Sequence, residues 1–319
     1  MKSLFAPKIK AALDFRQAVG KDIKSYATYL RNFDSFCAEH HTEDACLTKD
    51  VAWDWVYSPL HKNQNAVYHR INAICFLGRY LSSTGEDAYV FPAAMASTKH
   101  IPSPYVFTDG ELSRIFAAAD VLDKNLRNPL QHRVAPVVFR LIYTCGLRPN
   151  EGRELKRANI NLETGEFLIT NTKFQKERLI VMSSNMLELC RRYERYRIAE
   201  SPAESEYFFP TPKGGCYDRQ QFSKLFKKCW QQANAGVLAA DLPSVRVYDL
   251  RHRFASAILN RWIDEKRDLY AMLPYLRAYM GHFDLSATAY YIHLLPENLV
   301  KSNGIDWAAL ESVIPEVGV

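Results

Sequence analysis

Several features of common protein classes are missing from this chain of 319 residues. No apolar run approaches the roughly 18 residues that would indicate a membrane span, and the N-terminal stretch lacks the apolar core and cleavage site of a signal peptide. There is no Cys-x-x-Cys pair, and the seven cysteines are an odd number. A disulfide framework and a zinc site are therefore not indicated. We expect a cytoplasmic protein that holds no metal ion and has no contact with a membrane.

The composition that is present is typical of a globular protein. Hydrophobic residues make up 48% of the chain and aromatic residues 13%. The length leaves room for two domains, each with its own hydrophobic core. A net charge of +6 permits a polyanionic partner such as nucleic acid but does not require one.

The N-terminal third predicts amphipathic helices. Apolar residues recur every three or four positions from Ile23 to Cys37, and again from Val67 to Leu81. The start of the second helix is polar and basic, with Lys62, Asn63, Asn65, His69 and Arg70. Such a helix end is either a solvated surface or a place for phosphate contact, and the residues alone favour the solvated surface.

A change of pattern near residue 100 predicts the domain boundary. Residues 96–108 contain two prolines and no hydrophobic period, which is typical of an exposed linker. Thr108 and Glu111 then form a capping-box pattern that starts a new helix. We place the first domain at 1–100, the linker at 101–107 and the second domain at 108–319.

The second domain predicts helices with a small antiparallel β-sheet among them. A helix over 133–145 should end at Gly146, and another should begin at Pro149. Three strand-like runs follow at 159–162, 167–172 and 178–182. A helix from residue 219 has a basic flank made of Lys224, Lys227 and Lys228. The expected fold class is mainly α with a small antiparallel β-sheet, in two domains.

Polar residues of the second domain are weak signals singly, but their order is specific. Along the chain they are Arg148, Glu151, Lys173, Tyr248, Arg251, His252, Gly281, His282 and Tyr291. This order and spacing resemble the tyrosine recombinase (phage integrase) family, whose pattern is Arg, a hairpin Lys, His-x-x-Arg, His or Trp, and Tyr. The resemblance is strong over 106–295 and favours a simple Xer-like or transposon-recombinase-like architecture. The N-terminal helices are similar to the family's core-binding domain only in general shape.

The resemblance implies a reaction and a role for each residue. Tyr291 would attack a scissile DNA phosphodiester and form a 3′-phosphotyrosyl intermediate. Arg148 and Arg251 would hold the phosphate oxygens, which suits the charge of a pentacoordinate transition state. Lys173 would protonate the leaving 5′-oxygen, and His282 would hydrogen-bond the phosphate. The phosphotyrosyl linkage conserves the energy of the cleaved phosphodiester bond, so we expect no cofactor and no metal.

Supporting roles follow from the same resemblance. Glu151 would orient basic side chains, and His252 would support the pocket rather than donate protons. The first domain would be a helical core-binding (SAM-like) DNA-binding domain, and the second an α+β catalytic domain. Candidate DNA contacts are Lys62, Asn65, His69, Arg70, Lys176, Lys224, Lys227 and Lys228.

The resemblance also implies an assembly. Four copies would join two duplexes that carry inverted core sites, for integration, excision, transposition or resolution of DNA. Asp306 is a good N-cap for a short helix whose Trp307, Leu310 and Ile314 share one face. This helix would dock on a neighbouring copy; the alternative is that it packs on its own domain.

One position departs from the family pattern and leaves alternatives open. Tyr248 stands where the family most often has histidine, and a phenol is a poor base at neutral pH. The group that takes the proton of the nucleophile is thus open. Two further alternatives are a type IB topoisomerase, which reseals one duplex, and a DNA-binding relative without activity. A metalloenzyme based on His40 and His41 is remote, because this pair lacks partners.

Overall fold

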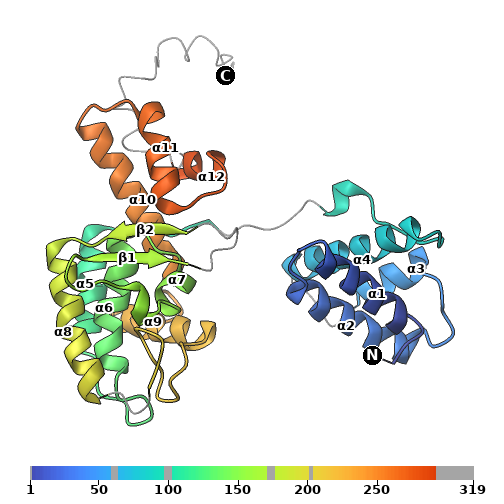
Figure 1. The fold of residues 1–319 in the computed structure, drawn as a ribbon, viewed down its shortest axis with the longest axis horizontal. Coiled ribbons are helices and arrows are strands. Elements are labelled where there is room, and N and C mark those ends of the chain that lie inside the picture. The colour runs from blue at the N-terminus through green and yellow to red at the C-terminus, as the bar shows by residue number, and fades with distance from the viewer. Residues whose placement is uncertain (1, 59–63, 97–102, 171–176, 201–203, 292–319) are drawn as a thin grey trace. The chain divides into compact units, whose positions relative to one another are not determined.

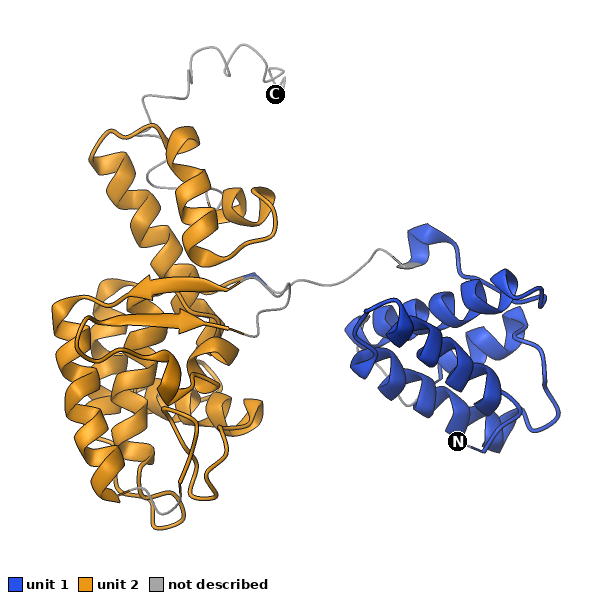
Figure 2. Cartoon of the chain, viewed as in Figure 1, with its two compact units in different colours: residues 1–103 blue, residues 104–319 orange. Residues whose placement is uncertain are grey.

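The chain folds into two compact units, residues 1–103 and 104–319 (Figure 2). The computed structural model describes residues 2–58, 64–96, 103–170, 177–200 and 204–291. Within these ranges, no helix combines the length and the apolar character that crossing a bilayer requires.

Unit 1 is a bundle of helices around one apolar core (Figure 1). Its elements are α1 (Ala6–Ala18), α2 (Lys24–His40), α3 (Lys49–Val56), α4 (Gln64–Ser83) and the 3₁₀ helix η1 (Ala93–Ala96). The predicted apolar stripe of α2 is confirmed, because Leu30, Phe33 and Cys37 are fully buried. The Phe33 ring lies 5.2 Å from the Trp55 ring of α3. The core is thus built from the periodic positions of the sequence.

One residue at the start of α4 is part of this core instead of a DNA-binding surface. Arg70 is 5% exposed and donates a hydrogen bond of 2.6 Å to the Trp55 carbonyl. Its guanidinium also lies 4.9 Å from the centre of the Trp55 ring. The prediction that Arg70 contacts phosphate is therefore wrong. Nearby, the His69 ring is half-buried and stacks on Tyr29.

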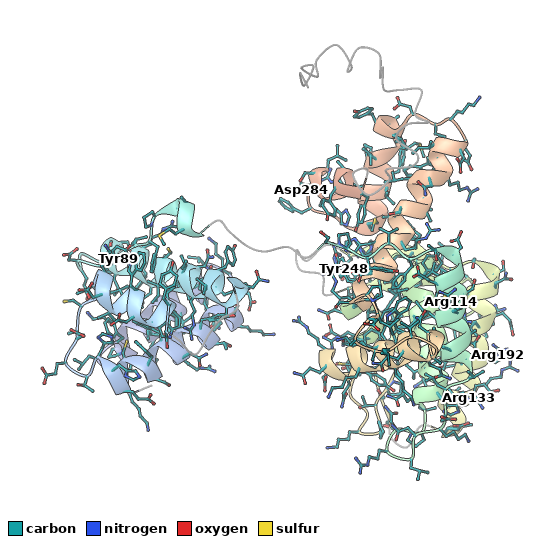
Figure 3. The ribbon with its side chains drawn as sticks, turned by 180° about the vertical axis from the view of Figure 1, so that it is seen from behind. Tyr89, Arg114, Arg133, Arg192, Tyr248 and Asp284 are labelled. Atoms are coloured by element: carbon teal, nitrogen blue, oxygen red, sulfur yellow. The ribbon has the colours of Figure 1, made fainter. Side chains whose placement is uncertain are left out.

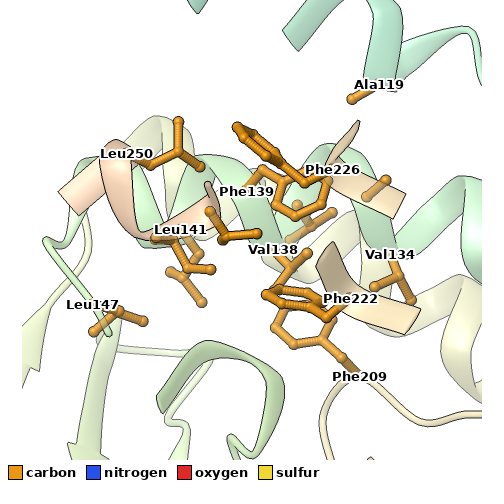
Figure 4. Packing of buried hydrophobic residues seen from close by; sticks show 14 of the residues in the cluster. Ala119, Val134, Val138, Phe139, Leu141, Leu147, Phe209, Phe222, Phe226 and Leu250 are labelled. Atoms are coloured by element: carbon orange, nitrogen blue, oxygen red, sulfur yellow. The ribbon is translucent and has the colours of Figure 1, made fainter. Parts of the chain in front are cut away.

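Unit 2 holds all the strands that the structure describes (Figure 1). Its elements are α5 (Asp109–Asp120), α6 (Gln131–Thr144), α7 (Pro149–Arg153), η2 (Arg157–Asn159), β1 (Glu166–Ile169), β2 (Arg178–Val181), α8 (Ser184–Glu200), α9 (Arg219–Ala233), α10 (Val247–Asp264), α11 (Leu269–Met280) and α12 (Ser286–Ala289). The centre of its core is α6, whose Phe139 ring lies 5.4 Å from Phe222 and 5.1 Å from Phe226 of α9 (Figure 4). These contacts place Phe222 and Phe226 on the face of α9 that packs on α6.

The sheet is smaller than the sequence predicts. β1 and β2 pair antiparallel with Phe167 opposite Ile180. The run 159–162 does not form a third strand: η2 occupies its start, and Ile160 makes only an isolated bridge to Phe167. The prediction of a third strand is wrong, because a helical turn uses the backbone groups that a strand would offer to the ladder.

The residues just before α5 are packed and do not form an exposed linker. Phe107 is 1% exposed, and its ring lies 5.7 Å from the Trp230 ring of α9. Residues 104–107, predicted as linker, thus belong to unit 2. The capping box at Thr108 is confirmed, since its side chain accepts from the Glu111 backbone N–H and Glu111 accepts from the Thr108 N–H.

The long helix α10 joins two cores of unit 2. Its Leu250 belongs to the main core, while Ala255 and Leu259 pack in a smaller core with residues of α11 and with Tyr291. In Figure 1, α10 runs from the level of the sheet to α11. The predicted site residues lie where these two cores meet.

Candidate active site

Arg148 is held at the start of α7 by the end of a neighbouring helix. It is the N-cap, and Pro149 takes the first helical position as predicted. The backbone N–H of Arg148 donates to Glu151 Oε2 at 2.8 Å. The guanidinium donates to Glu151 Oε1 at 2.8 Å and to the Gly281 carbonyl at 2.6 Å. Arg148 thus links α7 to the C-terminal end of α11.

Arg251 of α10 is fully buried and bound to two backbone carbonyls. It donates to Gly146 O at 2.6 Å and to Met280 O at 2.7 Å. Gly146 has a φ of +59°, which few side chains tolerate, and this conformation ends α6 next to Arg251. The Arg251 Nε is buried and has no hydrogen-bond partner within the described ranges. A buried donor without a partner is expected where a ligand completes the site.

His282 is bound on both ring nitrogens. Its Nε2 lies 2.8 Å from the Arg251 guanidinium and its Nδ1 lies 2.7 Å from Thr288 Oγ1. A guanidinium can only donate, so Nε2 accepts and Nδ1 carries the proton, which it donates to Thr288. Burial, followed by the charges of Arg251 and Arg148, lowers the pKa of His282 to about 3. The ring is therefore neutral. Gly281 with φ +64° makes the turn that presents His282.

Tyr291 is buried against two histidines. It is 2% exposed, and its ring is nearly parallel to that of His282, with 6.0 Å between ring centres. The ring of His252 lies 5.4 Å away. Burial raises the pKa of Tyr291 to about 12, although a hydrogen bond and the charge of Arg251 act in the opposite direction. The neighbouring Tyr290 is 40% exposed, so only Tyr291 belongs to the site.

Tyr248 and His252 lie one turn apart on α10, with 4.9 Å between ring centres. Tyr248 is half-buried and electrostatically raises the pKa of Tyr291. Burial and then the charges of Arg246 and Arg251 lower the pKa of His252 to about 4. The neutral ring of His252 therefore flanks Tyr291 from the side of α10, and the ring of Tyr248 lies next to that histidine.

Glu151 lies among three arginines, and one of them, Arg178, is not among the residues predicted from the sequence. Arg178, the first residue of β2, donates to Glu151 Oε1 at 3.0 Å and to Oε2 at 2.6 Å. Burial would raise the pKa of Glu151, but Arg178, the backbone N–H of Arg148 and the charge of Arg251 together lower it to about 2. One signal for Arg178 existed in the sequence: Glu151 was expected to orient basic side chains, and Arg178 begins the strand after Lys173.

The structure thus brings together most of the predicted site residues. These are Arg148, Glu151, Tyr248, Arg251, His252, His282 and Tyr291, with Arg178 added. Three guanidiniums with one carboxylate leave an excess of positive charge, which suits an anionic group such as a phosphate. The predicted Lys62, Lys173 and Lys176 lie outside the described residues.

Other features of unit 2 lie away from this site. Lys224, Lys227 and Lys228 are exposed on α9, as their basic flank predicts. A groove of about 830 Å³ between α6 and α8 is lined by Arg133 and Arg192 and includes none of the site residues. In Figure 3, Arg133 lies toward the end of unit 2 opposite to Asp284, with Tyr248 between them. The described part of the chain contains no group of three or more metal-ligating side chains arranged to hold a metal ion.

Comparison with known proteins identifies the family. The model of the Phage integrase family matches residues 106–298. A putative integrase/recombinase of Sinorhizobium fredii, y4rE, is 30% identical over 89% of this chain and 90% of its own length. Tyrosine recombinase XerD of Rhizobium meliloti is 32% identical over 51% of this chain and 48% of its own length. The chain therefore belongs to the phage integrase family and is a tyrosine recombinase.

Solved structures share its fold. The XerH site-specific recombinase bound to difH substrate aligns with a TM-score of 0.64 and 19% identity, over 91% of this chain and 82% of that chain. The Tn1549 transposon integrase aligns with a TM-score of 0.63 and 12% identity, over 89% and 94%. These similarities confirm the fold class, mainly helical with a small sheet.

Proposed function

We propose that this tyrosine recombinase cleaves and rejoins DNA through Tyr291. The phenolic oxygen of Tyr291 attacks the scissile phosphorus, the bond from phosphorus to the 5′-oxygen breaks, and a 3′-phosphotyrosyl linkage forms. The phenol proton leaves to a base, and Lys173 gives a proton to the 5′-oxygen. The reverse reaction with a 5′-hydroxyl of another strand rejoins the DNA.

The observation that supports this most is the position of Arg251. Its guanidinium lies 2.8 Å from His282 Nε2, and its charge and hydrogen bonding lower the pKa of Tyr291 against the effect of burial. A phosphate placed for attack by Tyr291 would lie against this guanidinium. Arg148 would add a second guanidinium, so that charge developing on the phosphate oxygens is neutralised in a buried site.

His282 would change its role when phosphate binds. In the free protein its Nε2 accepts from Arg251. A phosphate that takes over this N–H releases Nε2, and its negative charge favours a protonated imidazole. His282 would then donate to the phosphate, with Thr288 still holding Nδ1.

The partner in this proposal is double-stranded DNA with inverted core sites. XerH and the Tn1549 integrase have been solved with DNA, and this chain shares their fold. The exposed Lys224, Lys227 and Lys228 of α9 would contact backbone phosphates, and unit 1 would bind the same duplex as a core-binding domain. Asn65 and His69 of α4 stay candidates for that contact.

Covalent trapping on genomic DNA tests the nucleophile. Sheared DNA from the source cells would be incubated with the protein, denatured with detergent, and sequenced from the ends that stay bound to protein. Wild type should yield adducts at one recurrent sequence, and Tyr291→Phe should yield none. Tyr290→Phe is the matched control, because its exposed hydroxyl lies outside the site. Adducts that persist in Tyr291→Phe, or vanish in Tyr290→Phe, would refute the assignment.

We further propose a tetramer on DNA, joined by the helix expected near residues 306–314, which lies outside the described residues. Deleting 303–319 should leave binding to one site intact but abolish the four-copy complex that joins two duplexes. The mass of the complex on DNA decides this, and a deletion variant that still forms tetramers contradicts it. A wild type that never joins two sites would favour a topoisomerase-like reaction instead.

A further inference from the structure

We propose that Arg178 is a positioning residue for DNA cleavage. It fixes the carboxylate of Glu151 and, through it, the guanidinium of Arg148, and it supports the turn at Gly281 that carries His282. This inference rests on the proposed function and adds a third arginine to the two that the family pattern predicts.

The first support is the way two arginines share one carboxylate. Glu151 Oε1 accepts from the guanidiniums of Arg178 at 3.0 Å and Arg148 at 2.8 Å. Glu151 Oε2 accepts from Arg178 at 2.6 Å and from the Arg148 backbone at 2.8 Å. Without Arg178, each carboxylate oxygen would lose one of these partners and the carboxylate could rotate. The Arg148 side chain is 25% exposed, so it would have room to follow.

The second support is the contact of Arg178 with the turn after α11. A β-carbon added at Gly281 would lie 3.0 Å from an Arg178 terminal nitrogen and 3.4 Å from its Cδ. The Arg178 side chain therefore lies directly against the Gly281 backbone. The carbonyls of Met280 and Gly281 in this turn accept from Arg251 and Arg148 respectively. Arg178 thus touches the backbone that orients both other guanidiniums.

The third support is that a gain in stability does not explain well why the ion pair of Arg178 and Glu151 is buried. The side chains of Arg178 and Glu151 are 10% and 7% exposed. Burying two charges is costly, and an apolar pair of similar volume often stabilises a fold as well. Moreover, Arg178 Nε is buried and has no partner in the described parts of the chain. Fixing the geometry of a charged site explains the pair better.

Arg178 also connects the site to the hairpin. It is the first residue of β2 and pairs with Ile169 of β1 across the ladder. In the sequence it follows the predicted acid Lys173 by five positions. The ion pair with Glu151 therefore attaches the strand that follows Lys173 to the arginine that would hold the phosphate.

The test compares arginine variants on two forms of the trapped DNA site. One form is ordinary DNA, and the other has a methylphosphonate at the scissile position, which removes one negative charge. The variants are Arg178→Met, Arg178→Lys and Arg148→Ala. Arg197→Met is the matched control: Arg197 makes a two-point ion pair with Glu194 at 2.6 and 3.0 Å, with 14% and 11% exposure, outside the site.

Arg178→Met should slow single-turnover cleavage of ordinary DNA about 100-fold, because small displacements of phosphate-holding groups have effects of that size. Its Kd for DNA should stay within about twofold of wild type, since the phosphate contacts that dominate affinity lie elsewhere. On methylphosphonate DNA, the loss of cleavage rate relative to wild type should be smaller than on ordinary DNA, for Arg178→Met as for Arg148→Ala. Arg178→Lys should fall between wild type and Arg178→Met, and Arg197→Met should match wild type on both forms.

Cleavage by Arg178→Met within about threefold of wild type would overturn the inference, since that is the scale of ordinary surface substitutions. So would a defect of equal size on both DNA forms, which is the result of a merely structural role. If Arg178→Met does not fold, the Arg178→Lys ratio between the two DNA forms decides in the same way. Tyr291→Phe on the same gel keeps the two questions apart: adducts there refute the proposed nucleophile, whatever the Arg178 variants do.

Discussion

Replacing Glu151 with glutamine tests whether one carboxylate holds the arginines of the site together. The Glu151 side chain is 7% exposed, binds Arg148 and Arg178, and lies 4.0 Å from Arg251. Glutamine keeps the shape but removes the only negative charge of this group. A pKa near 2 in place of the ordinary 4.5 corresponds to about 3 kcal/mol of stability. The cost of breaking a buried ion pair, about 3–5 kcal/mol, agrees with this.

The pH dependence has a defined sign. The folded pKa of Glu151 is depressed, so its contribution is fully present above about pH 4.5, the ordinary pKa of an unfolded glutamate carboxyl. It is lost as the pH falls toward 2, where the folded form binds the proton. The difference in unfolding free energy between wild type and Glu151→Gln should therefore be constant from pH 7 to about 5 and shrink below that range.

Native-state hydrogen exchange of peptides from α7 and α10 measures this in the full chain. Glu188→Gln is the control, because Glu188 is 65% exposed and its arginine neighbours are 3.8 and 3.9 Å away. It should change stability by less than about 0.5 kcal/mol. A Glu151→Gln effect below about 1 kcal/mol at pH 7, or one that grows on acidification, would refute the reasoning.

Three further substitutions test other parts of the structure. Gly146→Ala should destabilise unit 2 by at least about 2 kcal/mol in urea titrations, because φ is +59° and the added carbon would lie 2.5 Å from the Phe254 ring; an unchanged midpoint would contradict this. Lys173→Ala should regain cleavage on DNA with a 5′-phosphorothiolate leaving group, which needs no proton, and rescue of Lys176→Ala instead would reverse the two assignments. Arg70→Met should destabilise unit 1 but leave the salt dependence of DNA binding unchanged, because this guanidinium is buried. If the slope of log K for DNA binding against log salt concentration became shallower by about one, Arg70 would be shown to contact phosphate.

Local signals in the sequence predicted much of the fold. The capping box at Thr108, the glycine stop at Gly146 and the proline start at Pro149 each depend on a few neighbouring residues, and all three occur in the structure. The polar pattern at the start of α4 was ambiguous because its outcome depends on residues that are distant in the sequence. Whether Arg70 faces water or the Trp55 ring depends on how α3 packs against α4, which local spacing does not contain. Burial of Phe107 likewise depends on the distant helix α9.

The candidate site, too, could be predicted from the sequence only in part. The order of residues along the chain indicated which side chains would meet, from Arg148 to Tyr291. It did not indicate Arg178, because a hairpin arginine is ordinarily a solvated residue and its partner Glu151 is 27 positions away. Nor did it indicate that His282 would be neutral, since that follows from the direction of its hydrogen bonds with Arg251 and Thr288.

The position of Tyr248 leads to a last prediction about proton transfer. Tyr291 is protonated at neutral pH, and His282 cannot accept its proton while Nε2 is bound to Arg251. Tyr248 lies close enough to raise the pKa of Tyr291, but a phenol is itself a weak base, so we expect it to act as a hydrogen-bond donor to the phosphate.

Tyr248→Phe removes one such bond and should slow single-turnover cleavage about tenfold, while Tyr248→His should stay active. The comparison with Tyr291→Phe gives the decisive measurement. If Tyr248→Phe forms no more covalent adduct than Tyr291→Phe does, Tyr248 is required for proton removal, and its role as a hydrogen-bond donor is wrong.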